Sequence, residues 1–402
     1  MPRFEPFSAI RYADPKAWDR LIAPPYDVLS KDDIASLAAD EHNIVWIDMP
    51  GGDDSRYDQA ACRLLSWLNE GILIEEDMPS FYIYRMQMTD ATGLRRTISG
   101  VLGGLEVVDA GAGKVLPHEH TTEKDVTDRL ELTKATGTNM SPVWGLSLAN
   151  GLTDALSAPG ETIGSVEVDG VIHILERVSD PERIDQIRSI IDSDDVLIAD
   201  GHHRYGVSRM YRDLIRKATG SSKTPAERTL TFINELSADQ LAIEAIHRIY
   251  DSISTSELKE DLSASFTFEA IDEEVEPRHL AEMVERKRLI FINPGGKAEW
   301  LVPREGAFDG VRNLDGAWLE HALAGSIAEV SYQHGLEEVK QEMDSRNPLK
   351  KHAGAVLIRP TSIEEIIATA REGALMPPKS TFFTPKLRTG LVIRPTALLP
   401  EN

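Results

Sequence analysis

Four polar side chains follow a buried-looking strand at the centre of the chain. The apolar run Val-Leu-Ile-Ala ends at Asp200, and Gly201, His202, His203 and Arg204 come before a sequence typical of a helix. Backbone N–H groups at a helix start lack internal partners, and the helix dipole favours an anion there. Glycine lets a ligand approach the backbone, and arginine can donate two parallel hydrogen bonds to phosphate oxygens. Histidine can also donate hydrogen bonds near neutral pH. These residue types predict a phosphate-binding turn, although the chain lacks the Walker sequence.

Two other interpretations of this turn stay open. Asp-Gly is a common turn dipeptide, so the segment could be a packing solution to a strand-to-helix connection. The paired histidines could also bind a metal, but adjacent histidines on a loop point apart, and no nearby cysteine accompanies them. If the turn binds phosphate, we expect Arg204 to be an exposed cleft residue that contributes little to the core.

A second group of candidates surrounds a predicted helix that begins near residue 126. Phosphoryl transfer needs carboxylates to orient a hydroxyl and to hold Mg²⁺. Glu119 and Asp128 are the candidates for both roles, and His202 is a third catalytic candidate. Asp128 and Glu131 are three residues apart, so they would share one helix face. The alternative for any one of these carboxylates is a solvated acidic helix start.

Polar residues on predicted loops complete the candidate site. Tyr26 could stack on an adenine or lie in the core, and its neighbour Asp27 could simply cap the next segment. Lys379 could reach a phosphate, although most lysines simply lie at the protein surface. Tyr26 and Lys379 therefore join Asp200 to Arg204 as predicted nucleotide-binding residues. The predicted substrate-binding residues are His118, Thr121, Arg129, Asn139, Ser141 and Lys386.

Residues 173–211, HILERVSDPERIDQIRSIIDSDDVLIADGHHRYGVSRMY, resemble the nucleotide-binding core of the ParB/sulfiredoxin-like superfamily. In that core a helix precedes a strand whose Gly-x-x-Arg loop opens a second helix and holds nucleotide phosphates. The Asp-Gly-His-His-Arg loop is similar to that of the superfamily's free-serine kinases. The resemblance covers about residues 165–250 and implies ATP or ADP as a ligand.

Four motifs in order resemble a large prokaryotic family filed as a domain of unknown function, some members of which are linked to serine phosphorylation. They are APPYDVLS, PHEHTTEKDVTDRLELTKATGTNMSPVWGL, IADGHHRY and MPPKSTFFTPKLRTGLVIRP. This resemblance covers nearly the whole chain. It is specific for the family and much less specific for the reaction.

Composition and charge exclude several functions. The chain departs from the sulfiredoxins that the core resembles, because that resemblance implies a thiol for sulfinic-acid reduction at the position of His202. The single cysteine, Cys62, is expected to be a buried core residue. A net charge of −23 repels a phosphate backbone, and no basic helix-turn-helix follows the core, so a nucleic-acid partner is not expected. No apolar run approaches the ~20 residues of a membrane helix, and the start lacks a signal-peptide core. We therefore expect a soluble cytoplasmic protein with no membrane partner.

The pattern of predicted elements indicates an α+β fold with a central ParB/sulfiredoxin-like core. We expect an N-terminal α+β segment over 1–150, the core with its Asp-Gly-His-His-Arg loop over 151–250, and a C-terminal α+β segment over 251–402. Asp169-Gly170 predicts a hairpin turn. The apolar run at 43–50 predicts a strand.

Taken together, the sequence predicts a nucleotide-dependent phosphotransferase, a kinase that acts on a small hydroxylated metabolite. Free L-serine is the first candidate acceptor, with ATP or ADP as donor and Mg²⁺ as cofactor. Two alternatives stay open: a ParB-like nucleotide-binding regulatory module without turnover, and a hydrolase that transfers phosphate to water. The sequence also leaves open a homodimer.

Overall fold

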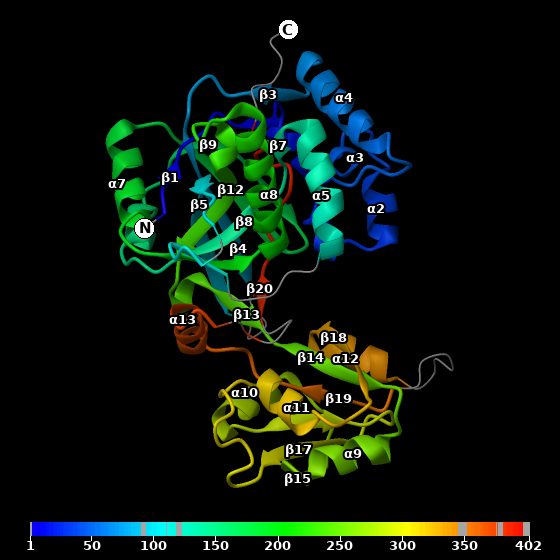
Figure 1. Ribbon diagram of the computed structural model, residues 1–402. Helices are drawn as coiled ribbons and strands as arrows, with labels where there is room; N and C mark the ends of the chain where they lie inside the picture. The colour runs from blue at the N-terminus through cyan, green and yellow to red at the C-terminus, as the bar shows by residue number, and fades with distance from the viewer. Residues whose placement is uncertain are drawn as a thin grey trace. The chain divides into compact units, whose positions relative to one another are not determined.

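The computed structural model describes residues 2–89, 94–109, 111–117, 123–344, 352–374, 376 and 381–396. The chain divides into two compact units. The first unit comprises Met1–Ala242 together with Pro385–Asn402, and the second comprises Ile243–Thr384. The expected α+β fold is confirmed, since helices and sheets occur in both units (Figure 1).

The first unit is built on a mixed sheet that has nine strands within the described residues. Their order is β6-β11-β8-β12-β5-β4-β10-β9, and β1 also pairs with β5. The β6–β11 and β8–β12 pairs are parallel, and the other pairs are antiparallel. The strands are β1 (Phe4–Glu5), β4 (Phe81–Thr89), β5 (Arg95–Glu106), β6 (Val115–Leu116), β8 (Val143–Ser147), β9 (Glu161–Val168), β10 (Val171–Val178), β11 (Val196–Asp200) and β12 (Arg228–Glu235).

Helices and short ribbons surround this sheet. In Figure 1, α5 and α8 run side by side, and they share an apolar contact of Leu130 with Val207 and Tyr211. The helices are α1 (Trp18–Leu21), α2 (Lys31–Leu37), α3 (Val45–Asp48), α4 (Arg56–Asn69), α5 (Glu123–Thr136), α6 (Leu152–Ala155), α7 (Pro181–Ile191) and α8 (His202–Thr219). The 3₁₀ turns are η1 (Pro15–Ala17), η2 (Tyr26–Val28), η3 (Pro225–Glu227) and η4 (Ala238–Gln240). The two short ribbons pair β2 (Ile10–Tyr12) with β3 (Leu73–Glu75), and β7 (Thr138–Asn139) with β21 (Arg394–Pro395).

Both faces of the sheet are buried. Alternate residues of β4 and β5, such as Ile83 and Val101, pack with Ile187 and Ile191 of α7. Successive strand residues point to opposite faces, so the neighbours of these residues form a second layer. In that layer the ring of Phe232 lies edge-on to Tyr84 at 5.6 Å and to Trp144 at 5.5 Å, measured between ring centroids.

The last described segment of the chain returns to the first unit. The backbone of Thr389 exchanges hydrogen bonds of 3.2 and 2.8 Å with that of Ala23, and Ile393 pairs in the same way with Ile10. The strand β21 then pairs with β7. This return places residues 386–394 beside segments that precede them by more than 160 positions.

The second unit has an antiparallel sheet in the order β15-β17-β16-β19-β14-β18. Leu289 and Phe291 of β16 pack on one face, and Ile290 and Ile292 pack on the other. Its strands are β14 (Ile246–Asp251), β15 (Phe266–Ile271), β16 (Leu289–Ile292), β17 (Ala298–Pro303), β18 (Glu329–His334) and β19 (Gly354–Leu357), and β13 (Ala242–Glu244) pairs separately with β20 (Phe382–Thr384). Its helices are α9 (Thr255–Ser263), α10 (Pro277–Arg286), α11 (Asp315–Ala322), α12 (Leu336–Met343) and α13 (Ile363–Arg371).

The domain boundaries differ from those predicted. The boundary at residue 150 does not divide the structure, because β8 precedes it and pairs with β11 and β12, which follow it. Hydrogen bonds across one sheet therefore join the predicted segments 1–150 and 151–250. The predicted segment 251–402 is itself divided, because the residues from Pro385 onward belong to the first unit.

Two local predictions also need correction, and one is confirmed. The predicted strand at 43–50 contains α3 instead, because the Asn43 side chain accepts a hydrogen bond from the backbone N–H of Val45 at 3.0 Å and starts a helical turn. Cys62 is exposed, since the buried face of α4 is formed by Ala60, Leu64 and Trp67. The predicted Asp-Gly hairpin is present between β9 and β10.

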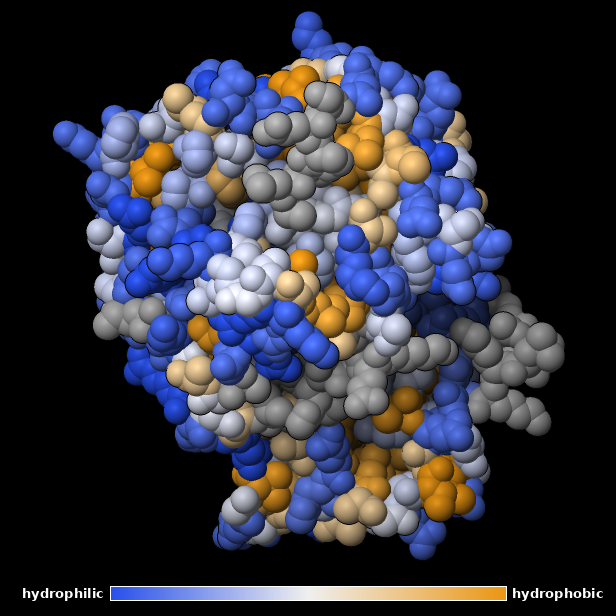
Figure 2. Space-filling view, turned by 45° about the horizontal axis from the view of Figure 1, so that its top comes forward, coloured by the Kyte–Doolittle hydropathy of each residue, from blue (hydrophilic) through white to orange (hydrophobic). Residues whose placement is uncertain are grey.

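Hydrophilic side chains cover most of the face of the molecule drawn in Figure 2, with smaller hydrophobic areas between them. This agrees with a chain in which charged residues make up 27%. Within the described part of the chain, every helix is too short or too polar to cross a lipid bilayer.

Two glycine substitutions test the packing of the first unit. A Cβ at Gly100 would lie 2.4 Å from the Phe232 ring and 2.7 Å from the Ile233 carbonyl oxygen, so Gly100→Ala should destabilise the unit by about 1–3 kcal/mol. Gly206 lies within α8 with open space around it, so Gly206→Ala should stabilise by up to about 1 kcal/mol. Urea unfolding followed by circular dichroism measures both changes. Shifts of the same sign and size would contradict the packing described.

Candidate functional site

The predicted strand–turn–helix is present at the centre of the first unit. β11 ends at Asp200, Gly201 adopts a left-handed conformation with φ of +84°, and α8 begins at His202. Any Cβ at Gly201 would lie 3.1 Å from the guanidinium of Arg204, so the turn needs glycine for both its conformation and its space. His202 and His203 are half-buried on the first turn of α8.

Arg204 is buried, with only 8% of its surface exposed, and this corrects the expected exposed position. Its guanidinium donates hydrogen bonds to the Pro142 carbonyl, to Asp200 at 2.9 Å and to Asp27 at 3.2 Å. Burial alone would lower the pKa of Arg204, but the Asp27 and Asp200 carboxylates outweigh it and raise this pKa. Arg204 is therefore charged and joins three segments of the chain.

Lys386 extends the ion pairs of Arg204. Its ammonium lies 3.3 Å from the Asp200 carboxylate. Burial would raise the pKa of Asp200, but Lys386 and Arg204 hold this pKa well below its usual range. The turn at the start of α8 therefore carries two cations and two carboxylates, and the predicted residues Asp200, Arg204 and Lys386 are in direct contact.

A second set of ion pairs lies beside the first and is built around Arg129 of α5. Its guanidinium lies 4.6 Å from the centre of the Tyr26 ring, 2.6 Å from Asp128 and 3.5 Å from Asp48. Burial raises the pKa of Asp48, and the nearby guanidinium groups of Arg129 and Arg204 only partly offset this. Tyr26 is thus held between Arg129 and the Arg204 group.

A cavity of about 50 Å³ lies between the two sets of ion pairs. It is lined among others by Tyr26, Arg129, Asn139, Ser141 and Arg204. The Tyr26 hydroxyl and the Arg204 Nε are buried without a hydrogen-bond partner. Burial raises the pKa of Tyr26 to about 12, so the phenol stays protonated at neutral pH. The space holds a few water molecules at most, so it is too small for a nucleotide.

Asp128 does not fit its predicted role as a Mg²⁺ ligand. One carboxylate oxygen accepts hydrogen bonds from Arg56 at 3.0 Å and from the Tyr57 hydroxyl at 2.8 Å, and the other accepts from Arg129. Burial would raise the pKa of Asp128, but Arg129 outweighs it and lowers this pKa. Two guanidinium groups at the carboxylate would repel a divalent cation. The described residues include no cluster of three or more metal-ligating side chains.

The remaining predicted residues divide into three groups. Ser141 lines the cavity, and its hydroxyl is hydrogen-bonded to that of Thr389 at 2.7 Å. Asn139 also lines the cavity, but its side-chain oxygen is occupied by the Leu230 N–H at 3.1 Å and by Arg394 at 3.3 Å. The predicted residues His118, Glu119, Thr121 and Lys379 lie outside the described residues.

Three participants were not among the predicted site residues. Asp27 lies in the same motif as Tyr26, so the motif could have indicated it, but a capping role also explains an aspartate at this position. Asp48 and Arg56 lie in segments with no motif, and only the fold brings them to Asp128 and Arg129.

Comparison with known proteins identifies the family. The family model described as "Protein of unknown function (DUF1015)" matches residues 4–317. The chain belongs to this family. This confirms the resemblance inferred from the four motifs, and no curated protein matches the chain.

Several solved structures are similar to this DUF1015 protein. A mutant free serine kinase in complex with AMP has 14% sequence identity and a TM-score of 0.37, with 69% of this chain and 89% of that chain covered. A conserved hypothetical protein from Pyrococcus furiosus has 14% identity and a TM-score of 0.36, with 69% and 92% covered. SbnI from Staphylococcus aureus, truncated at its C-terminus, has 14% identity and a TM-score of 0.38, with 75% and 90% covered.

Because Arg204 is buried, we expect that its removal lowers the unfolding free energy of this DUF1015 protein. Arg204→Ala leaves Asp27 and Asp200 without their guanidinium partner, so we expect a loss of about 3–5 kcal/mol of unfolding free energy. The matched control is Arg188→Ala, because Arg188 is 36% exposed and pairs with Glu5 at the surface, where a loss of about 0–1 kcal/mol is expected. Urea unfolding distinguishes the two, and equal losses would show that the Arg204 pairs do not stabilise the unit.

The lowered pKa of Asp200 predicts a pH dependence. A carboxylate whose pKa falls on folding stabilises the fold above its unfolded pKa of about 3.9 and loses this contribution as the pH falls below that value. Asp200→Asn should therefore have a lower melting temperature than the wild type at pH 6, and the difference should shrink towards pH 3. Thermal melts across this range measure the effect. Parallel curves for the two proteins would contradict the ion-paired state of Asp200.

Proposed function

We propose that this DUF1015 protein is a nucleotide-dependent phosphotransferase that acts on a small hydroxylated metabolite. The observation that carries the proposal is the convergence of charged side chains from separate motifs at the start of α8. Arg204 comes from the turn itself, Asp27 from the N-terminal motif and Lys386 from the C-terminal motif. Such a cluster at a helix N-terminus suits the terminal phosphates of a nucleotide.

For a nucleotide to bind, one carboxylate must give up its contact with a cationic side chain. Asp27 is the candidate, because its side chain is 34% exposed and its 3.2 Å contact with Arg204 is longer than the 2.9 Å contact of Asp200. A phosphate oxygen would replace Asp27 on Arg204, while Asp200 keeps Arg204 and Lys386 in position. The ion pairs are therefore a closed state of the site, and the nucleotide opens it.

The displaced Asp27 then faces the acceptor. In the proposed reaction, the acceptor hydroxyl oxygen bonds to the terminal phosphorus, the bond to the bridging oxygen breaks, and the hydroxyl proton passes to the Asp27 carboxylate. Arg204 and Lys386 stabilise the charge on the transferred group. This assigns to Asp27 the role first predicted for Asp128, whose oxygens are occupied by Arg56 and Arg129.

The acceptor and cofactors are proposed on other grounds. Free L-serine is the first acceptor to test, because the Asp-Gly-His-His-Arg loop is similar in sequence to that of free-serine kinases. ATP and ADP are both candidate donors. No step is assigned to Mg²⁺, since the described carboxylates do not form a site for it. His202 stays a proposed phosphate contact on the first turn of α8.

A turnover assay with matched variants tests the proposal. Purified protein is incubated with ATP or ADP, with and without Mg²⁺, and with serine, threonine, homoserine or glycerol, and phosphorylated product is detected by ³¹P NMR. Asp27→Asn should lower turnover about 10²–10⁴-fold while nucleotide still binds, since it removes a general base. Lys386→Gln should weaken nucleotide binding about tenfold. Arg188→Gln is the control and should behave like the wild type.

The outcomes distinguish the proposed kinase from its rivals. Nucleotide binding without any product would support the regulatory module, and inorganic phosphate without phosphorylated acceptor would support the hydrolase. Wild-type nucleotide affinity in Lys386→Gln together with wild-type turnover in Asp27→Asn would overturn the assignment of the site.

A further inference from the structure

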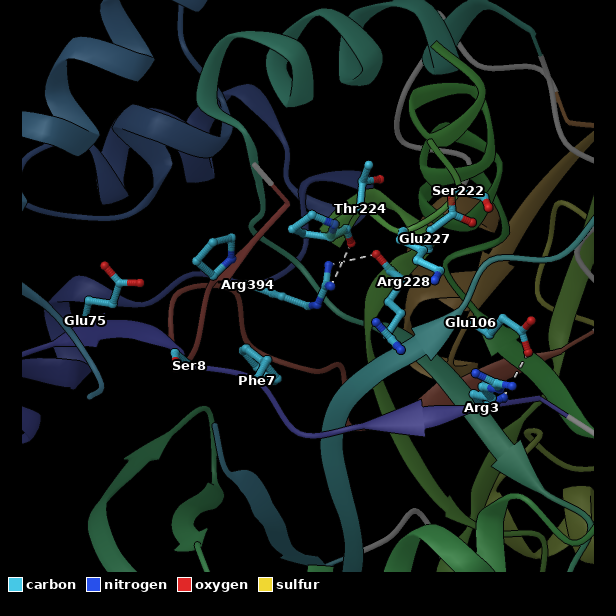
Figure 3. A pocket seen from close by; sticks show the side chains of 13 residues that line it. Arg3, Phe7, Ser8, Glu75, Glu106, Ser222, Thr224, Glu227, Arg228 and Arg394 are labelled. Carbon is cyan, nitrogen blue, oxygen red and sulfur yellow. Dashed lines mark hydrogen bonds between the residues drawn. The ribbon is translucent and has the colours of Figure 1, made fainter. Parts of the chain in front are cut away.

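A larger pocket lies elsewhere in the first unit, and the proposed function makes no use of it. Its volume is about 700 Å³, and it opens among the N-terminal segment, the end of β5, η3 and β21 (Figure 3). Four cations, Arg3, Lys223, Arg228 and Arg394, line it together with the apolar rings of Phe7 and Pro225. Basic groups beside apolar rings form a surface that suits a small organic anion.

Arg394 is buried in this pocket wall without a counter-ion. Only 4% of its surface is exposed. Its guanidinium donates to the Arg228 carbonyl at 2.7 Å, the Pro225 carbonyl at 2.8 Å and the Asn139 side-chain oxygen at 3.3 Å, and its Nε has no partner. All three acceptors are neutral, and no ion pair to Arg394 exists within the described part of the chain. Burial and the neighbouring Arg228 lower the pKa of Arg394 to about 9.

Arg228 adds a second, poorly neutralised charge. A Cβ built on Gly104 would lie 3.1 Å from the Arg394 Nε and 3.3 Å from the Arg228 Cβ and Cδ, so both side chains pass over the same glycine. The nearest carboxylate to the Arg228 guanidinium, that of Glu5, is 3.9 Å away. Two neighbouring cationic side chains without strong pairing are a costly arrangement unless an anion joins them.

The acidic residues of the pocket wall have other partners. Glu227 accepts a hydrogen bond from Arg216 at 2.8 Å. Glu106 accepts from the backbone N–H of Arg3 at 3.0 Å and lies 3.7 Å from Lys114. In Figure 3, Glu75 lies apart from the Arg228 and Arg394 side chains. These carboxylates therefore do not neutralise the two arginines.

The Thr224 hydroxyl lines the same pocket and is buried without a hydrogen-bond partner, but its side chain points away from the two guanidinium groups (Figure 3). We propose that this pocket is a second anion site, which binds the phosphate group of a small phosphorylated metabolite through Arg228 and Arg394. The apolar rings of Phe7 and Pro225 would contact the rest of that molecule. The site is separate from the proposed transfer site, and its occupancy does not depend on turnover.

The test uses the full chain, without nucleotide or acceptor, and inorganic phosphate as the probe in isothermal titration calorimetry. The wild type should bind phosphate saturably. Arg228→Gln should weaken binding at least about tenfold, because it removes a charge-assisted contact. Thr224→Val should change the affinity little, because the Thr224 side chain points away from the two arginines. Arg278→Gln, at an exposed ion pair of the second unit, should bind like the wild type.

Further variants and probes show at which of the two sites the phosphate binds. Lys386→Gln should retain phosphate binding, and loss of binding in Lys386→Gln but not in Arg228→Gln would place phosphate at the α8 turn and overturn the proposal. Arg394→Gln probes the buried charge directly, and Arg228→Gln remains decisive if that variant does not fold by circular dichroism. Absence of saturable phosphate binding, or binding of acetate and citrate in preference to phosphate, would also overturn it.

Discussion

The buried guanidinium of Arg204 connects the parts of the first unit that would otherwise have little reason to meet. It donates hydrogen bonds to Asp27 in the N-terminal motif, to the Pro142 carbonyl in the loop before β8 and to Asp200 at the end of β11. A buried charge is costly without its carboxylate partners, so each of these segments is restricted in position. Gly201 follows from the same constraint, because the guanidinium occupies the space that a side chain there would need.

The charges around this arginine are nearly balanced, although the whole chain carries a net charge of −23. Arg204 and Lys386 face Asp27 and Asp200, and the neighbouring set pairs Arg129 and Arg56 with Asp48 and Asp128. Local neutrality lets these groups be buried together at moderate cost. It also means that an anion can enter only by exchange with a carboxylate. Selectivity would then depend on how well the entering group matches the one it replaces.

The sequence predicted much of the local structure and only part of the site. The turn at Gly201 and the Asp169-Gly170 hairpin were predictable because both depend on a few adjacent residues. The contact between Asp200 and Lys386 joins positions that were separately predicted, but no periodicity in the sequence indicates that they meet. The predicted exposure of Arg204 was wrong for a related reason. Consecutive polar residues at a turn suggest exposure, and only the tertiary structure supplies the carboxylates that allow Arg204 to be buried.

The return of the C-terminal segment has a consequence for synthesis. Domains generally fold in the order in which they leave the ribosome. Here the second unit, Ile243–Thr384, is synthesised completely before Lys386 exists. At typical translation rates of about 5–20 residues per second, roughly 10–40 s separate Arg204 from Lys386. During that interval Asp200 lacks one of its two cations, and β7 lacks its partner β21. The contacts of the first unit with its C-terminal segment are therefore the last to form during synthesis, after the whole second unit has been translated.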